Sequence, residues 1–139
     1  MTVARSSFEI KTPGKVSVVN ITGQVRAVLE GASVREGLVV VSVPHTTCGL
    51  CVNEDEQGLR DDLVRMGTSL LEPLERSGPF RHDCIDDNAR AHLTAVLLGH
   101  SVTLPVSEGD LVLGTWQSVF LLELDGPRSR RVDVFLLGD

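Results

Sequence analysis

The stretch that decides the fold class runs from His100 to Asp139 and reads HSVTLPVSEGDLVLGTWQSVFLLELDGPRSRRVDVFLLGD. Short runs rich in Val and Leu alternate here with turn residues, at 107–109 and 125–127, which is typical of consecutive strands. We expect these strands at 101–106, 110–113, 115–124 and 130–137. Because they follow one another without intervening helices, they favour an α+β fold over a regular βαβ alternation.

About three helices are expected before these strands. Apolar side chains recur there every three or four residues, with Asn20 as a start signal and Gly31, Pro73 and Gly99 as stop signals. The expected helices span 21–30, 54–72 and 86–98. Further strands are expected at 3–10 and 15–19, as a pair around the turn at 12–14, and at 37–43, with extended chain continuing to 53. The sequence predicts a compact domain of mixed or antiparallel sheets.

The composition indicates one acidic globular domain, residues 1–139. Lys and Arg number 13 against 19 Asp and Glu, the net charge is −6, and only 4% of residues are aromatic. Such a chain lacks the basic surface and the stacking rings of nucleic-acid binders. It also lacks an apolar run near the roughly 18 residues of a membrane span. We therefore expect no nucleic acid or membrane partner, and a cytoplasmic protein whose three cysteines stay reduced.

The segment His45-Thr46-Thr47-Cys48-Gly49-Leu50-Cys51-Val52-Asn53-Glu54 carries the first group of polar side chains. In a strand, alternate residues share a face, so the odd-numbered residues would present an imidazole, a hydroxyl, a thiol and an amide together. Gly49 would leave room for a ligand to approach the backbone. The Cys-x-x-Cys spacing is also used in redox and zinc sites. Residues three apart in a strand point to opposite faces, however, so buried structural thiols are the favoured interpretation.

The segment 82–92 carries the second group, His82, Asn88 and His92. Asn88 and His92 share one helix face, opposite the stripe Ala89, Leu93, Val96 and Leu97 that we expect to face the core. With His45, the two histidines would form a set of three, which is how catalytic zinc sites are built. The alternative is that the histidines only form local hydrogen bonds.

The third group begins at Gly114-Thr115-Trp116-Gln117 and continues into the arginines after Asp125. Strand alternation puts Gln117 and Glu123 on a polar face that could hold a ligand. Arg128, Arg130 and Arg131 concentrate positive charge suited to phosphate or carboxylate. They could equally be solvated and paired with nearby acids. On the second helix, Glu54, Asp61 and Asp62 are ordinary solvated acids unless the helix start lies against His45, where a carboxylate could act as a general base.

Taken together, these segments resemble the YjbQ-like family, also described as secondary thiamine-phosphate synthases. The resemblance covers most of the chain and rests on the following motifs: His45-Thr46-Thr47 with Asn53-Glu54, His82-Asp83 with Asn88-Ala89 and His92-Leu93, Gly114-Thr115-Trp116-Gln117, and Asp125-Gly126-Pro127-Arg128. The sequence departs from the family at Cys48 and Cys51, where relatives often carry Ala, Ser or Thr. This departure argues against a catalytic role for the thiols.

The resemblance implies a YjbQ-like α+β fold, a homotrimer with pockets near subunit boundaries, and weak thiamine-phosphate synthase activity. That reaction joins a pyrimidine diphosphate to a thiazole phosphate, so the expected partner is a small phosphorylated substrate. A metabolite- or metal-binding protein without activity and a metal-dependent phosphohydrolase remain as alternatives. The expected catalytic residues are His45, Glu54, Asp62, Gln117 and Glu123; the expected substrate-binding residues are Asn53, Asn88, Thr115, Arg128 and Arg130; and the expected ligands of a divalent ion, Zn or Mg, are His45, His82 and His92.

Overall fold

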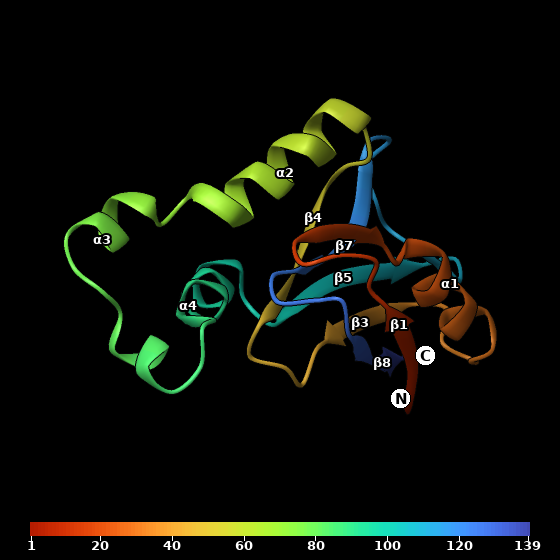
Figure 1. Ribbon diagram of the computed structural model, residues 1–139. Coiled ribbons are helices and arrows are strands. Elements are labelled where there is room, and N and C mark those ends of the chain that lie inside the picture. Colours follow the sequence, from red (N-terminus) through yellow and green to blue (C-terminus); the bar gives the residue numbers. More distant parts are fainter.

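The computed structural model describes residues 1–139 as two antiparallel sheets packed against each other, with helices at two sides (Figure 1). The larger sheet has the strand order β1 (Thr2–Lys11), β8 (Ser129–Gly138), β3 (Gly37–Ser42), β5 (Ser101–Ser107) and β6 (Asp110–Leu111). The smaller sheet has the order β2 (Ser17–Asn20), β7 (Gln117–Glu123) and β4 (Cys48–Glu54). The fold is therefore α+β, as expected.

Three helices of nine or more residues, α1 (Thr22–Glu30), α2 (Gln57–Ser69) and α4 (Ala89–Leu98), lie where the sequence places them, within a few residues. Two short turns of helix, α3 (Glu72–Arg76) and η1 (Arg81–Cys84), connect α2 to α4. Pro73 lies within the first residues of α3, so it starts a helix after α2 instead of simply ending one. No helix has the length and apolar character needed to cross a membrane.

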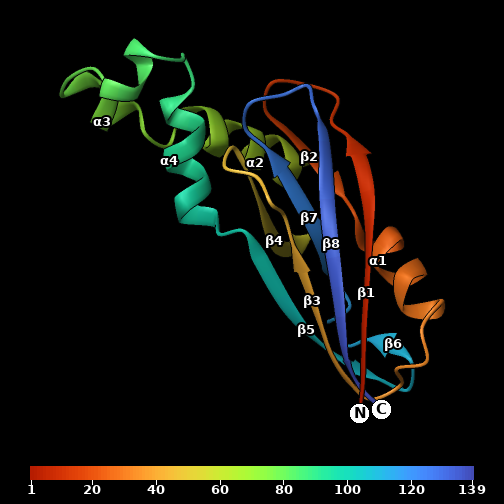
Figure 2. The same ribbon diagram turned by 90° about the horizontal axis from the view of Figure 1, so that it is seen from below.

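The main core lies between the two sheets. Alternate residues of β3 and β8, among them Val39 and Val134, pack against Leu50 of β4 and Leu121 of β7. Helix α1 closes one side of the sandwich, beside β1, with Val25 in the same cluster (Figure 2). Because these side chains are almost completely buried, this cluster supplies most of the hydrophobic stabilisation.

Strands β1 and β2 do not pair with each other, so the expectation of a pair around residues 12–14 is wrong. β1 pairs along its whole length with β8, and β2 pairs with β7 in the other sheet. The turn carries the chain from one sheet to the other, because β1 forms its backbone hydrogen bonds with β8 and β2 forms them with β7. β1 thus remains an edge strand of the larger sheet.

A second apolar layer covers the outer face of the smaller sheet. Val18, Phe120 and Leu122 are buried there beneath residues of α2 and Leu98 of α4. Strand β7 is therefore buried on both faces from Val119 onward, and the expectation that Glu123 lies on a polar face that could hold a ligand is wrong. Burial on both sides follows from its place in the middle of a sheet that has a core above and below.

Helix α4 does not bury the stripe that its periodicity suggests. Its buried residues are Ala89, Ala91 and Thr94, whereas Leu93, Val96 and Leu97 are 39%, 78% and 65% exposed. We call these last three residues the α4 apolar face. The helix lies close to β4 through small side chains, and a Cβ atom at Gly49 would lie 2.7 Å from Leu98 Cβ. The room at Gly49 is therefore filled by α4 and not by a ligand.

Candidate functional site

A buried ion pair joins the end of β7 to the start of β8. Arg130 Nη2 lies 2.6 Å from Glu123 Oε2, and the two side chains are 5% and 0% exposed. Thr12 Oγ1 donates to Glu123 Oε1 at 2.8 Å, and Arg130 Nη2 donates to the oxygens of Thr47 at 2.8 and 3.1 Å. Both carboxylate oxygens of Glu123, and the Nε and Nη2 atoms of Arg130, are thus hydrogen-bonded inside the protein. Neither residue is placed to touch a substrate, contrary to the expected catalytic and substrate-binding roles, and the pair instead fixes the loop that carries His45.

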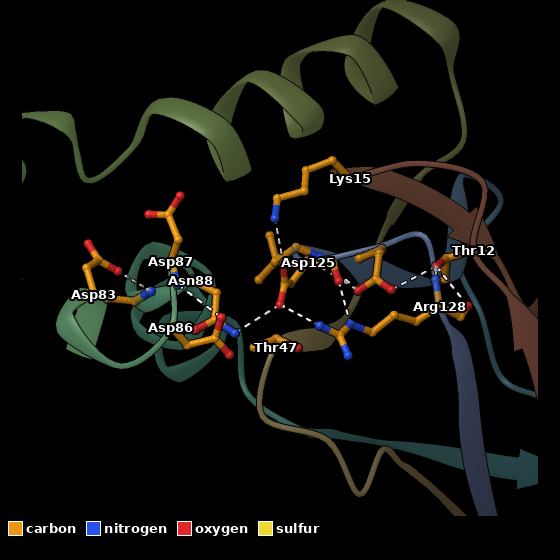
Figure 3. A network of polar contacts seen from close by, with 12 residues as sticks. Thr12, Lys15, Thr47, Asp83, Asp86, Asp87, Asn88, Asp125 and Arg128 are labelled. Atoms are coloured by element: carbon orange, nitrogen blue, oxygen red, sulfur yellow. Dashed lines mark hydrogen bonds and ion pairs between the residues drawn. The ribbon is translucent and has the colours of Figure 1, made fainter.

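Asp125 is the centre of a polar network that draws three segments together (Figure 3). Its carboxylate accepts hydrogen bonds from Lys15 Nζ at 2.6 Å, Asn88 Nδ2 at 2.9 Å and Arg128 Nη2 at 2.9 Å. Burial alone would raise the pKa of Asp125, but the hydrogen bonds from Lys15 and Asn88, with the nearby positive charges, lower it to about 2. Asn88 and Arg128, two of the expected substrate-binding residues, therefore lie close together because both bind Asp125.

Asp125 and Lys15 are not among the predicted site residues. The sequence identifies Asp125 only as part of a turn and of a family motif, and Lys15 lies 110 residues away in the chain. Gly126 is the residue of the sequence that indicates this contact between the two loops. A Cβ atom at Gly126 would lie 2.4 Å from the carbonyl oxygen of Gly14. Such a close approach of two backbones requires glycine and shows that the two loops meet.

His82 and His92 lie side by side at the start of α4. Their ring centroids are 4.7 Å apart in an edge-to-face arrangement, and His82 Nε2 is hydrogen-bonded to Asn88 Oδ1 at 3.0 Å. The two rings line a hollow of about 430 Å³ together with Arg81 and Phe80. The predicted proximity of His82 and His92 is thus confirmed.

His92 also faces a second hollow, of about 450 Å³, which we call the histidine pocket. Its other lining residues come from the loop before β4 and from the end of α4; they are His45, Thr46, Cys48, Ala95, Val96, Gly99 and His100. His100 was not singled out from the sequence, because it follows the helix stop at Gly99 with no motif around it. Three imidazoles and several small apolar side chains therefore share one open cavity.

The expected three-histidine metal site is not formed within one chain. No group of three His, Cys, Asp or Glu side chains is arranged to hold a metal ion. His45 Nε2 already accepts the N–H of Arg131 at 2.9 Å, and His82 Nε2 is occupied by Asn88. Nδ1 is therefore the only ring nitrogen of His45 and His82 that remains for a metal, the metal site stays a prediction, and we derive no metal-dependent step.

The remaining predicted residues lie away from the histidine pocket. Asn53 and Glu54 are at the far end of β4, roughly 17 and 20 Å from Cys48 at a rise of about 3.3 Å per residue. Glu54 pairs in register with Gln117, whose side chain accepts the N–H of Gly114 at 2.8 Å. The other two residues of this set are Thr115, exposed before β7, and Asp62, exposed on α2. One chain therefore does not bring the whole predicted set together.

The three arginines do not form a free cationic patch. Arg128 pairs with Asp125 and Arg130 with Glu123, while Arg131 Nε lies 3.2 Å from Asp133 Oδ1. Strand alternation explains the division, since Arg130 points into the core and Arg131 points outward. The alternative that the arginines pair with nearby acids is the one that the structure supports.

The three thiols are free, and Cys48 and Cys51 lie on opposite faces of β4, as expected. Cys48 belongs to the main core, and Cys51 packs against the second layer. Burial raises the pKa of Cys48 to about 11, so the thiol stays protonated and unreactive. A further hollow of about 790 Å³, between β1 and α1, contains none of the predicted site residues.

Known proteins with related sequences cover nearly the whole chain. Residues 6–139 match the model of the family described as UPF0047 protein YjbQ-like. A UPF0047 protein of Archaeoglobus fulgidus is 47% identical over 125 residues, which is 90% of this chain and 94% of that protein. A UPF0047 protein of Methanothermobacter thermautotrophicus is 41% identical over 99% of this chain and 94% of its own length.

Solved structures agree with the sequences. A YbjQ-like protein of unknown function from Sulfolobus solfataricus superposes with a TM-score of 0.92 at 40% identity, covering 99% of both chains. A hypothetical protein from Aeropyrum pernix gives a TM-score of 0.91 at 41% identity, covering 98% of this chain and 99% of that one. Identity at this level over both full lengths leaves no other assignment: the chain belongs to the UPF0047, YjbQ-like family.

Proposed function

We propose that the protein is a transferase of thiamine-phosphate synthase type that joins a pyrimidine diphosphate to a thiazole phosphate in the histidine pocket. The observation that carries the proposal is the pocket itself, in which His45, His92 and His100 line about 450 Å³ beside Ala95 and Val96. Ligand pockets for small molecules fall in the range of roughly 300–1,000 Å³ and combine apolar walls with a few polar groups.

The proposed reaction needs hydrogen-bond donors close to the diphosphate that leaves. Loss of diphosphate places negative charge on the leaving oxygens, so hydrogen-bond donors aimed at those oxygens lower the barrier without a covalent nucleophile. Imidazoles supply such donors near neutral pH. Arg81 lines the adjoining hollow, which shares His92 with the pocket, and adds a cation for a second phosphate.

The proposal includes a homotrimer whose pockets lie at subunit boundaries. The α4 apolar face borders the histidine pocket through Val96 and has no partner within the chain. Exposed contiguous apolar side chains mark association surfaces. A neighbouring subunit seated there would close the pocket, and it offers a route by which Asn53, Glu54 and Gln117 of one chain approach the pocket of another. We place this activity in the cytoplasm, where the three free thiols suit a reducing compartment.

Formation of thiamine phosphate from the two purified precursors tests the proposal. The product is converted to its fluorescent thiochrome derivative and quantified by chromatography. We expect His92→Ala to lower turnover by about 100-fold, the scale of a lost acid–base or donor group. The matched control is Arg65→Ala, on the outer side of α2 away from the pocket. We expect the control to keep wild-type turnover.

Two outcomes would contradict the proposed activity and indicate a different function. Thermal stabilisation by phosphorylated metabolites without any turnover would indicate a binding protein. Phosphate release from generic esters, with no thiamine phosphate, would indicate a phosphohydrolase.

The trimer is tested by light scattering of Leu97→Glu, since a charge on the α4 apolar face should yield monomers if that face is the interface. A variant that remains trimeric would contradict the arrangement.

A further inference from the structure

The His45 ring completes a strand ladder at the point where β3 leaves β8. The pairing of β3 with β8 ends at Ser42 and Asp133. Backbone groups of a strand alternate between its two neighbours, so the next β8 N–H on this side belongs to Arg131. His45 Nε2 lies 2.9 Å from that nitrogen. The imidazole therefore takes the place that a carbonyl of β3 would occupy.

This contact fixes which ring nitrogen carries the proton. A backbone N–H can only donate, so the nitrogen facing it must offer a lone pair. Nε2 of His45 is therefore bare, and a neutral ring with a bare Nε2 carries its hydrogen on Nδ1. Nδ1 makes no hydrogen bond within the chain. Since His45 lines the histidine pocket, its free N–H is available there.

We propose that His45 is held as the neutral Nδ1–H tautomer and donates that hydrogen to a phosphate or carbonyl oxygen of the ligand in the histidine pocket. The inference rests on the proposed small-molecule site and assigns His45 a narrower role within it. His45 is then a fixed donor that stabilises developing negative charge. It is neither a general base nor a metal ligand through Nε2, because that nitrogen is occupied.

The surroundings of His45 favour the neutral ring. Partial burial and the positive charge of Arg130 lower the pKa of His45 below its usual range, and the nearby Arg131 charge acts in the same direction. The Glu123 carboxylate opposes this effect but is itself neutralised by its ion pair with Arg130. At neutral pH the ring is therefore uncharged, and its donor strength depends on orientation and not on titration.

His82 is fixed in the opposite way. Asn88 donates from Nδ2 to the Asp125 carboxylate, which can only accept, so the Oδ1 atom of Asn88 faces His82 Nε2. An amide oxygen accepts, so His82 carries a hydrogen on Nε2, and the neutral ring then leaves Nδ1 bare. The two histidines on either side of His92 thus differ in role. His45 offers a hydrogen from Nδ1, whereas His82 offers a lone pair there.

Nitrogen NMR of the intact protein tests this directly. The chain has only four histidines, so two-bond ¹H–¹⁵N spectra of protein labelled in the imidazole rings can be assigned by removing one ring at a time. At neutral pH we expect His45 Nε2 to resonate as a bare nitrogen and Nδ1 as a protonated one, with the reverse pattern at His82. A protonated Nε2 at His45, or a doubly protonated ring, would overturn the inference.

Inorganic pyrophosphate, the leaving group of the proposed reaction, probes the donor role. Addition should shift the His45 Nδ1 resonance. His45→Asn keeps an N–H close to the Nδ1 position, whereas His45→Gln keeps an acceptor for Arg131 but no such donor. We expect pyrophosphate to bind His45→Gln about tenfold or more weakly than wild type and His45→Asn nearly as well as wild type. An unmoved Nδ1 resonance, or equal losses in both variants, would contradict the donor role.

Different results would overturn the proposed activity and the proposed role of His45. A protein that makes no thiamine phosphate but shows the Nδ1–H tautomer and its response to pyrophosphate overturns only the proposed activity. An active enzyme with His45 protonated on Nε2 overturns only the present inference.

Discussion

Replacing Asp125 by asparagine removes the carboxylate on which three segments of the chain converge. The hydrogen bonds and charges around it lower the pKa of this carboxyl from its usual 3.8 to about 2. A tenfold change in an acid constant corresponds to about 1.4 kcal/mol, so the network stabilises the folded protein by about 2 kcal/mol at neutral pH. We expect Asp125→Asn to lower the free energy of unfolding by that amount. Lys15 and Arg128, both largely exposed, remain solvated in the variant.

The stabilisation by the Asp125 carboxylate depends on pH. The folded-state pKa of Asp125 lies below the unfolded value, so the stabilisation is complete above about pH 4 and is lost as the pH falls toward 2. At pH 3 roughly half of it should remain. Urea unfolding followed by circular dichroism, at one protein concentration and at pH 7 and pH 3, measures the difference between wild type and variant, in which the other titrating groups cancel.

Asp110→Asn is the matched control, because Asp110 pairs with Arg26 on the surface and is 63% exposed. Its loss should be much smaller than that of Asp125→Asn, as exposed ion pairs contribute little. The reasoning is refuted if Asp125→Asn costs less than about 0.5 kcal/mol at pH 7, or if its cost is the same at pH 7 and pH 3.

Three further changes test other parts of the structure. Glu123→Gln leaves the buried Arg130 without its counter-charge and should cost about 3–5 kcal/mol in urea unfolding; a loss under about 1 kcal/mol would show that water reaches the arginine. The pKa of His45 is lowered in the folded state, so wild-type stability should decline as the pH falls below about 6.5, and His45→Gln should flatten that decline; parallel profiles would contradict this. Gly49→Ala places a Cβ 2.7 Å from Leu98 Cβ and should cost about 1–3 kcal/mol by displacing α4, and an unchanged midpoint would mean that the helix shifts freely.

Local patterns in the sequence predicted the strands and helices well, because each depends on neighbours within a few residues. The apolar run at 37–43 and the alternation at 130–137 lie on β3 and β8. Asn20 also acts at the start of α1, where its Oδ1 accepts the N–H of Thr22 at 3.0 Å. The YjbQ-like fold followed from motifs in the right order, which the related sequences and structures confirm.

Burial of a particular face was harder to predict. Periodicity shows that a helix has an apolar side but not what covers it, and α4 turns Val96 and Leu97 outward while burying small residues. The same limit applies to β7, where strand alternation predicts that Glu123 lies on a polar face that could hold a ligand. A strand with a core on both faces buries every side chain, and a carboxylate there needs a partner such as Arg130.

In the site, a contact within one short segment could be predicted from the sequence, whereas contacts between distant loops could not. His82 and His92 share one short segment, so their contact follows from helix geometry. Lys15 and Asp125 come from distant loops, and nothing local to either indicates the other. Of the three histidines that the sequence brings together as one possible set, His45 and His92 share a pocket and His82 lines the adjoining hollow. The occupied Nε2 of His45 depends on where β3 parts from β8, which no spacing reveals.

The edges of the larger sheet bear on how the protein behaves when concentrated. One edge, β6, is only two residues long, and the other, β1, exposes Arg5, Glu9 and Lys11 along its outer face. A strand added to β1 would lie against these charges, and β6 is too short to template one. Open-ended growth of the sheet into fibrils is therefore disfavoured at both ends. The exposed side chains of the α4 apolar face, by contrast, offer a surface for association that involves no pairing of strands from the larger sheet.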